Sequence, residues 1–150
     1  MIERPRPLAI CVFRNQGQIL VSQGADPQDG RTFYRPLGGG IEFGETSAEA
    51  VVREVREELG VEVRNVQLLG VLENLFTYNG ARGHEIVFVY DAAFLTPDYY
   101  QASELPAREG EVAFPAVWVR LSELGVGSPP LYPDGLLDLL RARPTDPPND

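Results

Sequence analysis

Apolar residues recur along this chain with two different periods, which predict strands arranged around one strong helix. Runs rich in β-branched, aliphatic and aromatic residues are typical of strands. They predict strands over residues 8–13, 18–21, 32–37, 61–76, 84–94 and 115–121. Asn15-Gln16-Gly17 and Asn79-Gly80 predict two hairpin turns. Loops are expected over residues 24–30 and 96–112, and a short helix is expected over residues 133–141.

A helix over residues 47–59 has the clearest signal in the chain. Thr46 and Glu49 stand at the spacing of a capping box, and Gly60 supplies a left-handed residue to end the helix. At about 100° per residue, the helical period predicts a buried apolar stripe. This stripe consists of Ala48, Val52, Val55 and Leu59. The opposite face carries Glu54, Glu57 and Glu58.

The acidic face of this helix points to a bound cation. Neighbouring carboxylates on a helix repel by roughly 0.2–0.5 kcal/mol per pair, so stability alone does not favour the arrangement. An ordinary solvated face relieved by Arg53 and Arg56 is the plainer alternative. Gly38-Gly39-Gly40 favours a ligand site, since glycines let backbone groups approach a ligand closely. Carboxylate and carbonyl oxygens suit Mg²⁺ or Mn²⁺, whereas a single histidine, His84, and a single cysteine, Cys11, provide no zinc cluster.

The segment from Gly39 to Val61, GGIEFGETSAEAVVREVREELGV, resembles the Nudix box and matches all nine of its specified positions. The resemblance implies an α/β fold, a Nudix-type α/β/α sandwich with a mixed β-sheet. It also implies a pyrophosphohydrolase that uses Mg²⁺ or Mn²⁺. Water would attack a phosphorus atom of a nucleoside diphosphate linked to another moiety.

The same resemblance implies a set of metal ligands. Glu57 and Glu58 are expected to be the main ligands, and Glu54 is expected to be a further ligand or the base that deprotonates the water. The Gly38 carbonyl is expected to complete the metal shell. This chain has Pro36-Leu37 where many family members have Leu-Pro.

Other residues are implied to position the catalytic groups. Arg53 is expected to orient Glu54, and Glu45 is expected to hold Arg53. Members of the family often use another acidic residue from a later loop as base or ligand. Glu111, with Glu109 behind it, is the candidate for that role in this chain.

The box does not identify the substrate, because specificity in the family comes from residues outside it. Tyr78 stands 17 residues after Val61, a spacing that resembles the family's diadenosine polyphosphate hydrolases. Arg35 is a candidate for a bidentate phosphate contact, and Gly39 and Gly40 for backbone contacts to the substrate. Candidate substrates are dinucleoside polyphosphates, ADP-ribose, nucleotide sugars and nucleoside triphosphates. Alternative stacking surfaces are Tyr34, Phe76 and Tyr90.

Length and charge narrow the class of protein. A chain of 150 residues predicts a single domain, over residues 1–143, with a disordered tail over residues 144–150. The net charge of −9 argues against binding to DNA or to an anionic membrane surface. No apolar run reaches the length of a membrane span, so a cytoplasmic protein with a small nucleotide-derived substrate is expected. The sequence leaves open whether the chain forms a homodimer.

Three other functions compete with a small-molecule pyrophosphohydrolase. A catalytically silent nucleotide sensor would be favoured by the loss of a ligand carboxylate, and none is lost. An RNA 5′-end pyrophosphohydrolase would be favoured by a basic channel, which the acidic balance argues against. A Nudix-like isomerase of a prenyl diphosphate would need a reactive cysteine, whereas Cys11 lies in an apolar run and is expected to be buried and inert.

Overall fold

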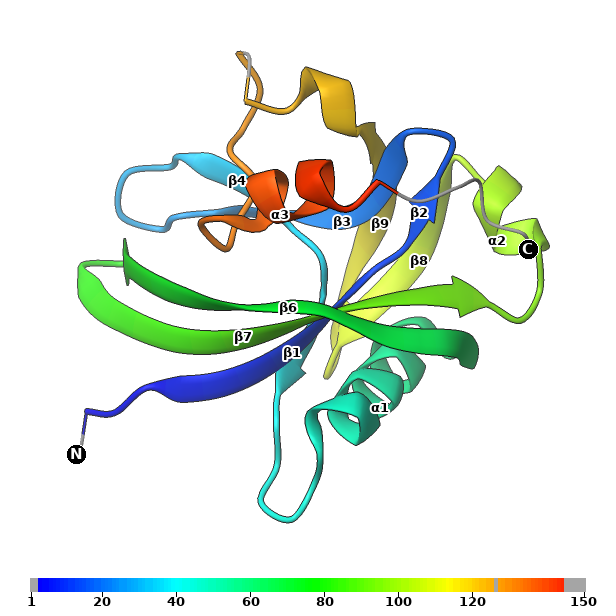
Figure 1. Ribbon diagram of the computed structural model, residues 1–150. Helices are drawn as coiled ribbons and strands as arrows, with labels where there is room; N and C mark the ends of the chain where they lie inside the picture. The colour runs from blue at the N-terminus through cyan, green and yellow to red at the C-terminus, as the bar shows by residue number, and fades with distance from the viewer. Residues whose placement is uncertain (1–2, 126, 145–150) are drawn as a thin grey trace.

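Strands from all parts of the chain form the centre of the computed structural model, and one long helix packs against them (Figure 1). The structure describes residues 3–125 and 127–144. The strands are β1 (Arg6–Val12), β2 (Arg14–Asn15), β3 (Gln18–Ala25), β4 (Thr32–Arg35), β5 (Leu37–Gly40), β6 (Val63–Tyr78), β7 (Ala81–Phe94), β8 (Glu104–Glu109) and β9 (Val112–Arg120). The helices are α1 (Ser47–Leu59), α2 (Asp98–Gln101), the 3₁₀ turn η1 (Leu121–Glu123) and α3 (Leu136–Ala142). Within these described residues, no helix is both long and apolar enough to span a membrane.

The first sheet has the strand order β5-β1-β7-β6 and mixes both strand directions. β1 runs parallel to β7, so that Ile10 pairs with Val89, and antiparallel to β5, so that Ala9 pairs with Gly39. β6 and β7 form a long antiparallel hairpin. The predicted mixed sheet is therefore confirmed.

The second sheet has the order β2-β3-β9-β8 and is antiparallel, with β4 paired to the far part of β3. β4 and β5 are consecutive in the chain but belong to different sheets. Pro36 separates them, and proline has no N–H with which to continue a ladder. The single strand predicted over residues 32–37 is thus wrong at this point, because the chain changes sheets there.

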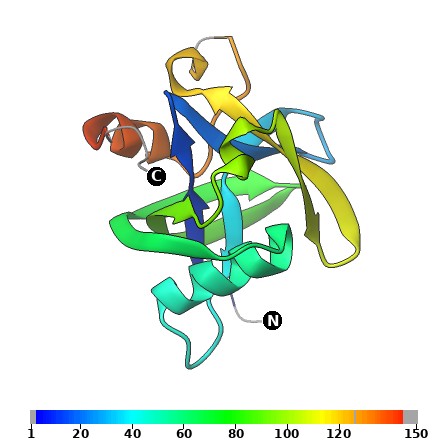
Figure 2. The same ribbon diagram turned by 90° about the vertical axis from the view of Figure 1, so that its right-hand side faces the viewer.

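The core has two parts, one on each face of β1. Ala9, Cys11 and Phe13 pack into the part that faces α1, whereas Leu8 and Ile10 pack into the part that faces α3. Side chains on a strand alternate between faces, so a strand covered on both sides needs a continuous apolar run such as residues 8–13. Figures 1 and 2 show α1 and α3 on opposite sides of this sheet. The expected layering of helix, sheet and helix is confirmed.

Both predicted hairpin turns are present. Gln16 and Gly17 have φ of 52° and 80°, and Asn79 and Gly80 have φ of 52° and 77°. Two consecutive positive φ angles are typical of the tight turns that match the twist of a hairpin. The predicted helix at residues 47–59 has the same bounds in the structure.

The prediction of a loop over residues 96–112 is wrong. This segment contains α2 and β8, and β8 pairs with β9 along its whole length. Only Leu105 and Ala107 of β8 are buried, and its other positions face solvent. The sequence of this strand is therefore largely polar. The loop expected over residues 24–30 likewise begins later, since β3 extends to Ala25. The tail over residues 145–150 lies outside the described residues.

Candidate active site

Helix α1 is fixed at both ends by the residues that predict it. The side chain of Thr46 accepts the backbone N–H of Glu49 at 3.1 Å, and Glu49 accepts the N–H of Thr46 at 2.9 Å. Gly60 ends the helix in the left-handed conformation with φ of 72°. A reciprocal cap of this kind satisfies backbone donors that the first helical turn leaves without partners. The acidic face is therefore held in a defined position.

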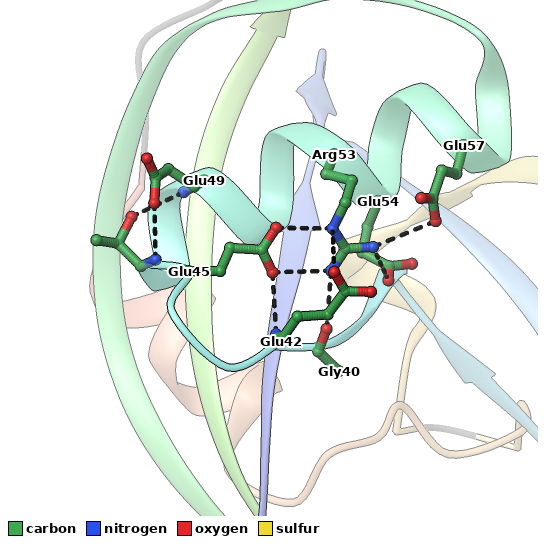
Figure 3. A network of polar contacts seen from close by, with 8 residues as sticks. Gly40, Glu42, Glu45, Glu49, Arg53, Glu54 and Glu57 are labelled. Atoms are coloured by element: carbon green, nitrogen blue, oxygen red, sulfur yellow. Dashed lines mark hydrogen bonds and ion pairs between the residues drawn. The ribbon is translucent and has the colours of Figure 1, made fainter.

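Arg53 is the centre of the polar network on this face (Figure 3). Its guanidinium donates to both oxygens of Glu45, at 2.7 and 3.0 Å, and to the carbonyl of Gly40 at 3.0 Å. It also donates to Glu54 at 2.9 Å and to Glu57 at 3.2 Å. A planar fork with five N–H donors suits such a convergence. The structure thus brings together five residues of the predicted site.

Glu45 fastens the preceding loop to the helix. Besides binding Arg53, Glu45 accepts the backbone N–H of Glu42 at 3.0 Å. The hydrogen bond from Arg53, followed by that backbone contact, lowers the pKa of Glu45 to about 2. Glu45 is therefore ionised at neutral pH and keeps the guanidinium beside Glu54.

Glu58 differs from the prediction that it faces away from the core. It is 7% exposed, and it accepts the backbone N–H of Gly38 at 2.9 Å. Burial and, to a smaller extent, the nearby charge of Glu54 together raise the pKa of Glu58 to about 8. The buried residues of α1 are Ala50, Val51, Val55 and Glu58. Three residues of the expected apolar stripe, Ala48, Val52 and Leu59, are only partly buried. The buried face of the helix is therefore rotated toward the acidic face. Strands β5 and β8 also pack on α1 and cover that additional side.

Two glycines of β5 allow the glutamates to lie against backbone. A Cβ on Gly39 would stand 2.7 Å from the carboxyl atoms of Glu54. Gly38 has φ of 145°, and a Cβ there would stand 2.2 Å from the carbonyl oxygen of Ala9. Gly39 therefore allows the close approach of β5 to α1, and Gly38 allows that of β5 to β1.

The β8–β9 hairpin brings a further acid to the site. The negative charge of Glu109 contributes to raising the pKa of Glu58, and the positive charge of Arg35 lowers it. Glu111 lies in the hairpin turn with its side chain exposed. Glu109, at the end of β8, is therefore the acid of this hairpin that acts on the helix.

A large cavity of about 920 Å³ lies on the side of the first sheet opposite α1. Arg35 and Tyr78 line it, as do Leu8, Phe33 and Tyr132. Gly39 and Gly40, the other expected substrate contacts, do not line it. Arg35 is therefore the predicted residue common to the cavity and to the surroundings of Glu58.

The alternative stacking residues separate into two groups. Phe76 lines the cavity, whereas Tyr34 and Tyr90 do not. Tyr90 is 7% exposed, and its hydroxyl lies 2.6 Å from that of Ser47, so it is a core residue that supports the start of α1. Cys11 is fully buried as expected, and burial raises the pKa of its thiol well above the usual value.

Three of the polar cavity residues that the sequence reasoning missed are Asn74, Glu85 and Asp134. The sequence contained a signal for two of them. Asn79-Gly80 fixes the hairpin register, and counting back from that turn pairs Asn74 with Glu85. The third, Asp134, reaches the cavity through the tertiary placement of α3, for which the sequence has no local signal.

The site has the donor chemistry of a hard divalent cation. Glu54 and Glu58 lie close enough for one to raise the pKa of the other, a cost that a cation would remove. Among the described residues, no three acidic, histidine or cysteine side chains form a finished cage. Mg²⁺ does not require one, since it usually retains several waters and binds one or two carboxylates together with substrate phosphates. Glu57, whose side chain is 59% exposed, presents its carboxylate to solvent beside Arg53, where an ion could reach it.

Known proteins are similar to this chain in both sequence and fold. NAD-capped RNA hydrolase NudC of Vibrio parahaemolyticus is 29% identical over 131 residues, which cover 87% of this chain and 43% of that protein. The chain thus spans less than half the length of the first curated relatives that it matches.

Solved structures agree with this similarity. The MutT NUDIX hydrolase from Burkholderia pseudomallei has a TM-score of 0.64 and 28% identity, covering 87% of this chain and 92% of that one. The E. coli ORF135 protein has the same fold, with a TM-score of 0.57, 23% identity and coverage of 95% and 96%. The family model described as NUDIX domain matches residues 3–140. With this match and the complete box on α1, the chain belongs to the Nudix hydrolase family.

Proposed function

We propose that this protein is a metal-dependent pyrophosphohydrolase that cleaves a nucleoside diphosphate linked to another moiety. The observation that carries the proposal is the position of Arg35. This residue lines the 920 Å³ cavity and also lowers the pKa of Glu58 on the acidic helix. Arg35 would therefore bind the phosphates of a nucleoside held in the cavity and would keep them near the acidic helix. Membership of the Nudix hydrolases supports the same reaction.

Each residue of the network has a defined part in the proposed reaction. Glu57 and Glu58 would hold the cation, together with the backbone at Gly38. Glu54 is a further ligand or accepts the proton of the attacking water, and Arg53 keeps its carboxylate in place through the 2.9 Å contact. Glu45 positions Arg53 through two hydrogen bonds.

A divalent cation, Mg²⁺ or Mn²⁺, would supply two effects when bound. It would lower the pKa of the attacking water and would neutralise charge on the phosphoryl group. Glu109, or Glu111 if the hairpin turn moves, is the proposed additional acid or base. The cavity residues Arg35 and Tyr78 would bind the phosphate and the base, and the Gly39–Gly40 backbone would face the phosphates.

The test is to measure hydrolysis by a Glu57→Gln variant in the presence of Mg²⁺. Glutamine keeps the size of the side chain but lacks the charge that binds the cation, so we expect kcat to fall by at least roughly 100-fold, an effect of the size known for removing one stabilising group. Glu62→Gln is the matched control, because Glu62 pairs with Arg56 on the exposed surface outside the site. Equal activity of the Glu57→Gln variant and the wild type would refute the role of Glu57.

A second candidate is hydrolysis at the nucleotide-capped end of an RNA. The specific observation in its favour is that relatives 28–30% identical to this chain are named NAD-capped RNA hydrolases. The net charge of −9 opposes a long basic contact with an RNA strand. Comparing the cleavage of NAD-capped RNA with that of free NAD decides between the two, since a small-molecule enzyme gains nothing from the attached strand.

A further inference from the structure

The cavity opposite α1 has an aromatic wall. The ring of Phe33 lies 6.3 Å from that of Tyr78, at an angle of 83°, and 5.4 Å from that of Tyr132, at 40°. The three rings come from β4, the tip of the β6–β7 hairpin and the segment before α3, and all of them line the cavity. Aromatic rings stack on any nucleobase, with little preference among bases. This wall therefore suits the binding of a base but does not distinguish one base from another.

The cavity also has a polar edge, formed by Asn74, Glu85 and Asp134. Asn74 is 6% exposed. Its amide oxygen accepts the backbone N–H of Asp134 at 3.3 Å, and its amide nitrogen donates to Glu85 at 3.3 Å. Both ends of the amide are used, so Asn74 connects the Glu85 carboxylate on the hairpin to the backbone of Asp134, just before α3.

The groups that this edge offers to a ligand are hydrogen-bond acceptors. An ionised carboxylate accepts hydrogen bonds and donates none. Asp26, the remaining acid of the cavity, is occupied structurally, since it accepts the N–H groups of Gln28 at 2.8 Å and Asn79 at 3.3 Å. The other two carboxylates of the lining are Asp134 and Glu85, and Glu85 accepts the Asn74 amide on one of its two oxygens.

We propose that this cavity selects a guanine-type base through Glu85 and Asp134, an inference that rests on the proposed function. Guanine presents two adjacent N–H donors, on ring N1 and exocyclic N2, which match a carboxylate in the manner of a bidentate contact. Adenine presents its amino group beside an acceptor nitrogen, and uracil presents its N–H between two carbonyls that a carboxylate repels. The same carboxylates repel the phosphates, whereas the cationic residues of the cavity lining are Arg31 and Arg35, and Arg35 is the one that acts on Glu58.

The first test compares guanosine, inosine and adenosine triphosphates as substrates with Mg²⁺. Inosine retains the ring N–H of guanosine and lacks the exocyclic amino group. We expect kcat/KM to decrease in the order guanosine, inosine, adenosine, with a guanosine-to-adenosine ratio of roughly five to 150, the range of one good bidentate base contact. Equal values, or a preference for adenosine, would overturn the proposal.

Variants then test whether the two carboxylates cause this preference. Glu85→Gln and Asp134→Asn should each reduce the ratio toward one through a higher KM for guanosine, with kcat unchanged. Asp138→Asn is the matched control, because Asp138 lies on α3 with its side chain exposed and does not line the cavity. Tyr78→Ala should weaken the binding of both substrates equally, since stacking does not distinguish bases. An unchanged ratio in both carboxylate variants would refute their assignment.

Binding measurements separate this proposal from the proposed function. Calorimetric titration of the wild-type protein with guanosine and adenosine monophosphates reports the preference for a base without requiring hydrolysis. Tighter binding of the guanosine compound, in a protein that hydrolyses no triphosphate, would support the base selection and count against the proposed reaction. Equal affinity for the two compounds would overturn the base selection whether or not hydrolysis occurs.

Discussion

The site contains four glutamates with identical side chains, Glu45, Glu54, Glu57 and Glu58. Their carboxylates differ in chemistry because their surroundings differ. Glu45 is held ionised by Arg53, with its pKa lowered to about 2. Glu58 is buried beside Glu54, which raises its pKa to about 8. A cation at this site would have to displace the proton of Glu58, so binding of the metal and release of a proton are linked.

This linkage predicts how pH affects the stability of the metal-free protein. Between pH 4.5, the ordinary pKa of this side chain, and pH 8, the folded protein retains a proton on Glu58 that the unfolded chain has released. Stability contributed by the protonated group is therefore complete below pH 4.5 and is lost as the pH rises toward 8. In chelator, we expect the melting temperature to fall across this range more steeply in the wild type than in Glu58→Gln.

Magnesium provides the control for that experiment. Mg²⁺ should raise the melting temperature of the wild type more at pH 8 than at pH 5. At pH 8 fewer Glu58 side chains carry a proton that the cation has to displace. It should have little effect on the Glu58→Gln variant at either pH. Parallel pH profiles for the two proteins in chelator would contradict the buried, proton-linked role of Glu58.

At the scale of elements, the site depends on how closely β5 approaches α1. A Gly39→Ala variant tests this approach, since its Cβ would stand 2.7 Å from the carboxyl atoms of Glu54. Gly39 lacks a positive φ angle, so the backbone tolerates alanine and the carboxylate has to move instead. We expect a fall in kcat of roughly tenfold or more, as for a misplacement of about 1 Å, with little change in melting temperature.

A glycine elsewhere in the sheets gives the comparison. Gly70→Ala on β6 would bring its Cβ to 3.2 Å from the flexible end of Leu139, away from the acidic face. Its kcat should equal that of the wild type. Full activity of Gly39→Ala would show that Glu54 does not need its observed position.

The capping box of α1 makes a separate prediction about stability. Thr46→Ala removes the side-chain acceptor of the Glu49 N–H and should lower the free energy of unfolding by about 1 kcal/mol. Thr46→Ser retains a hydroxyl and should recover most of the loss. Chemical denaturation of the three proteins measures the difference, and an equal loss in both variants would exclude the cap as its cause.

The same elements show which parts of the fold are predictable from sequence. The bounds of α1 follow from Thr46, Glu49 and Gly60, because capping is a local interaction. β8 was missed, since its pairing with β9 buries only Leu105 and Ala107 of an otherwise polar segment. The burial of Glu58 was also missed, because it follows from the packing of β5 and β8 on the helix and not from the helical period.

On the scale of the whole molecule, the two faces of the first sheet carry different parts of the proposed site. The face covered by α1 has the glutamates and Arg53, and the opposite face has the cavity with Tyr78, Glu85 and Asp134. The sequence predicted that Glu45, Arg53 and Glu54 lie together on the first face, since they belong to one contiguous motif. The second face draws on residues 8 to 134, which only the tertiary fold brings together.

The central claim is that water attacks phosphorus in a nucleoside diphosphate derivative at this site. The most direct measurement is mass spectrometry of the products formed in ¹⁸O-labelled water, with Mg²⁺ and then Mn²⁺, from dinucleoside polyphosphates, ADP-ribose, nucleotide sugars, NAD and nucleoside triphosphates. We predict cleavage within the phosphate chain of at least one substrate, with one ¹⁸O atom in a phosphate group of a product, and no cleavage without metal. Nucleotide binding without turnover of any of these compounds would contradict the claim and would favour a nucleotide sensor.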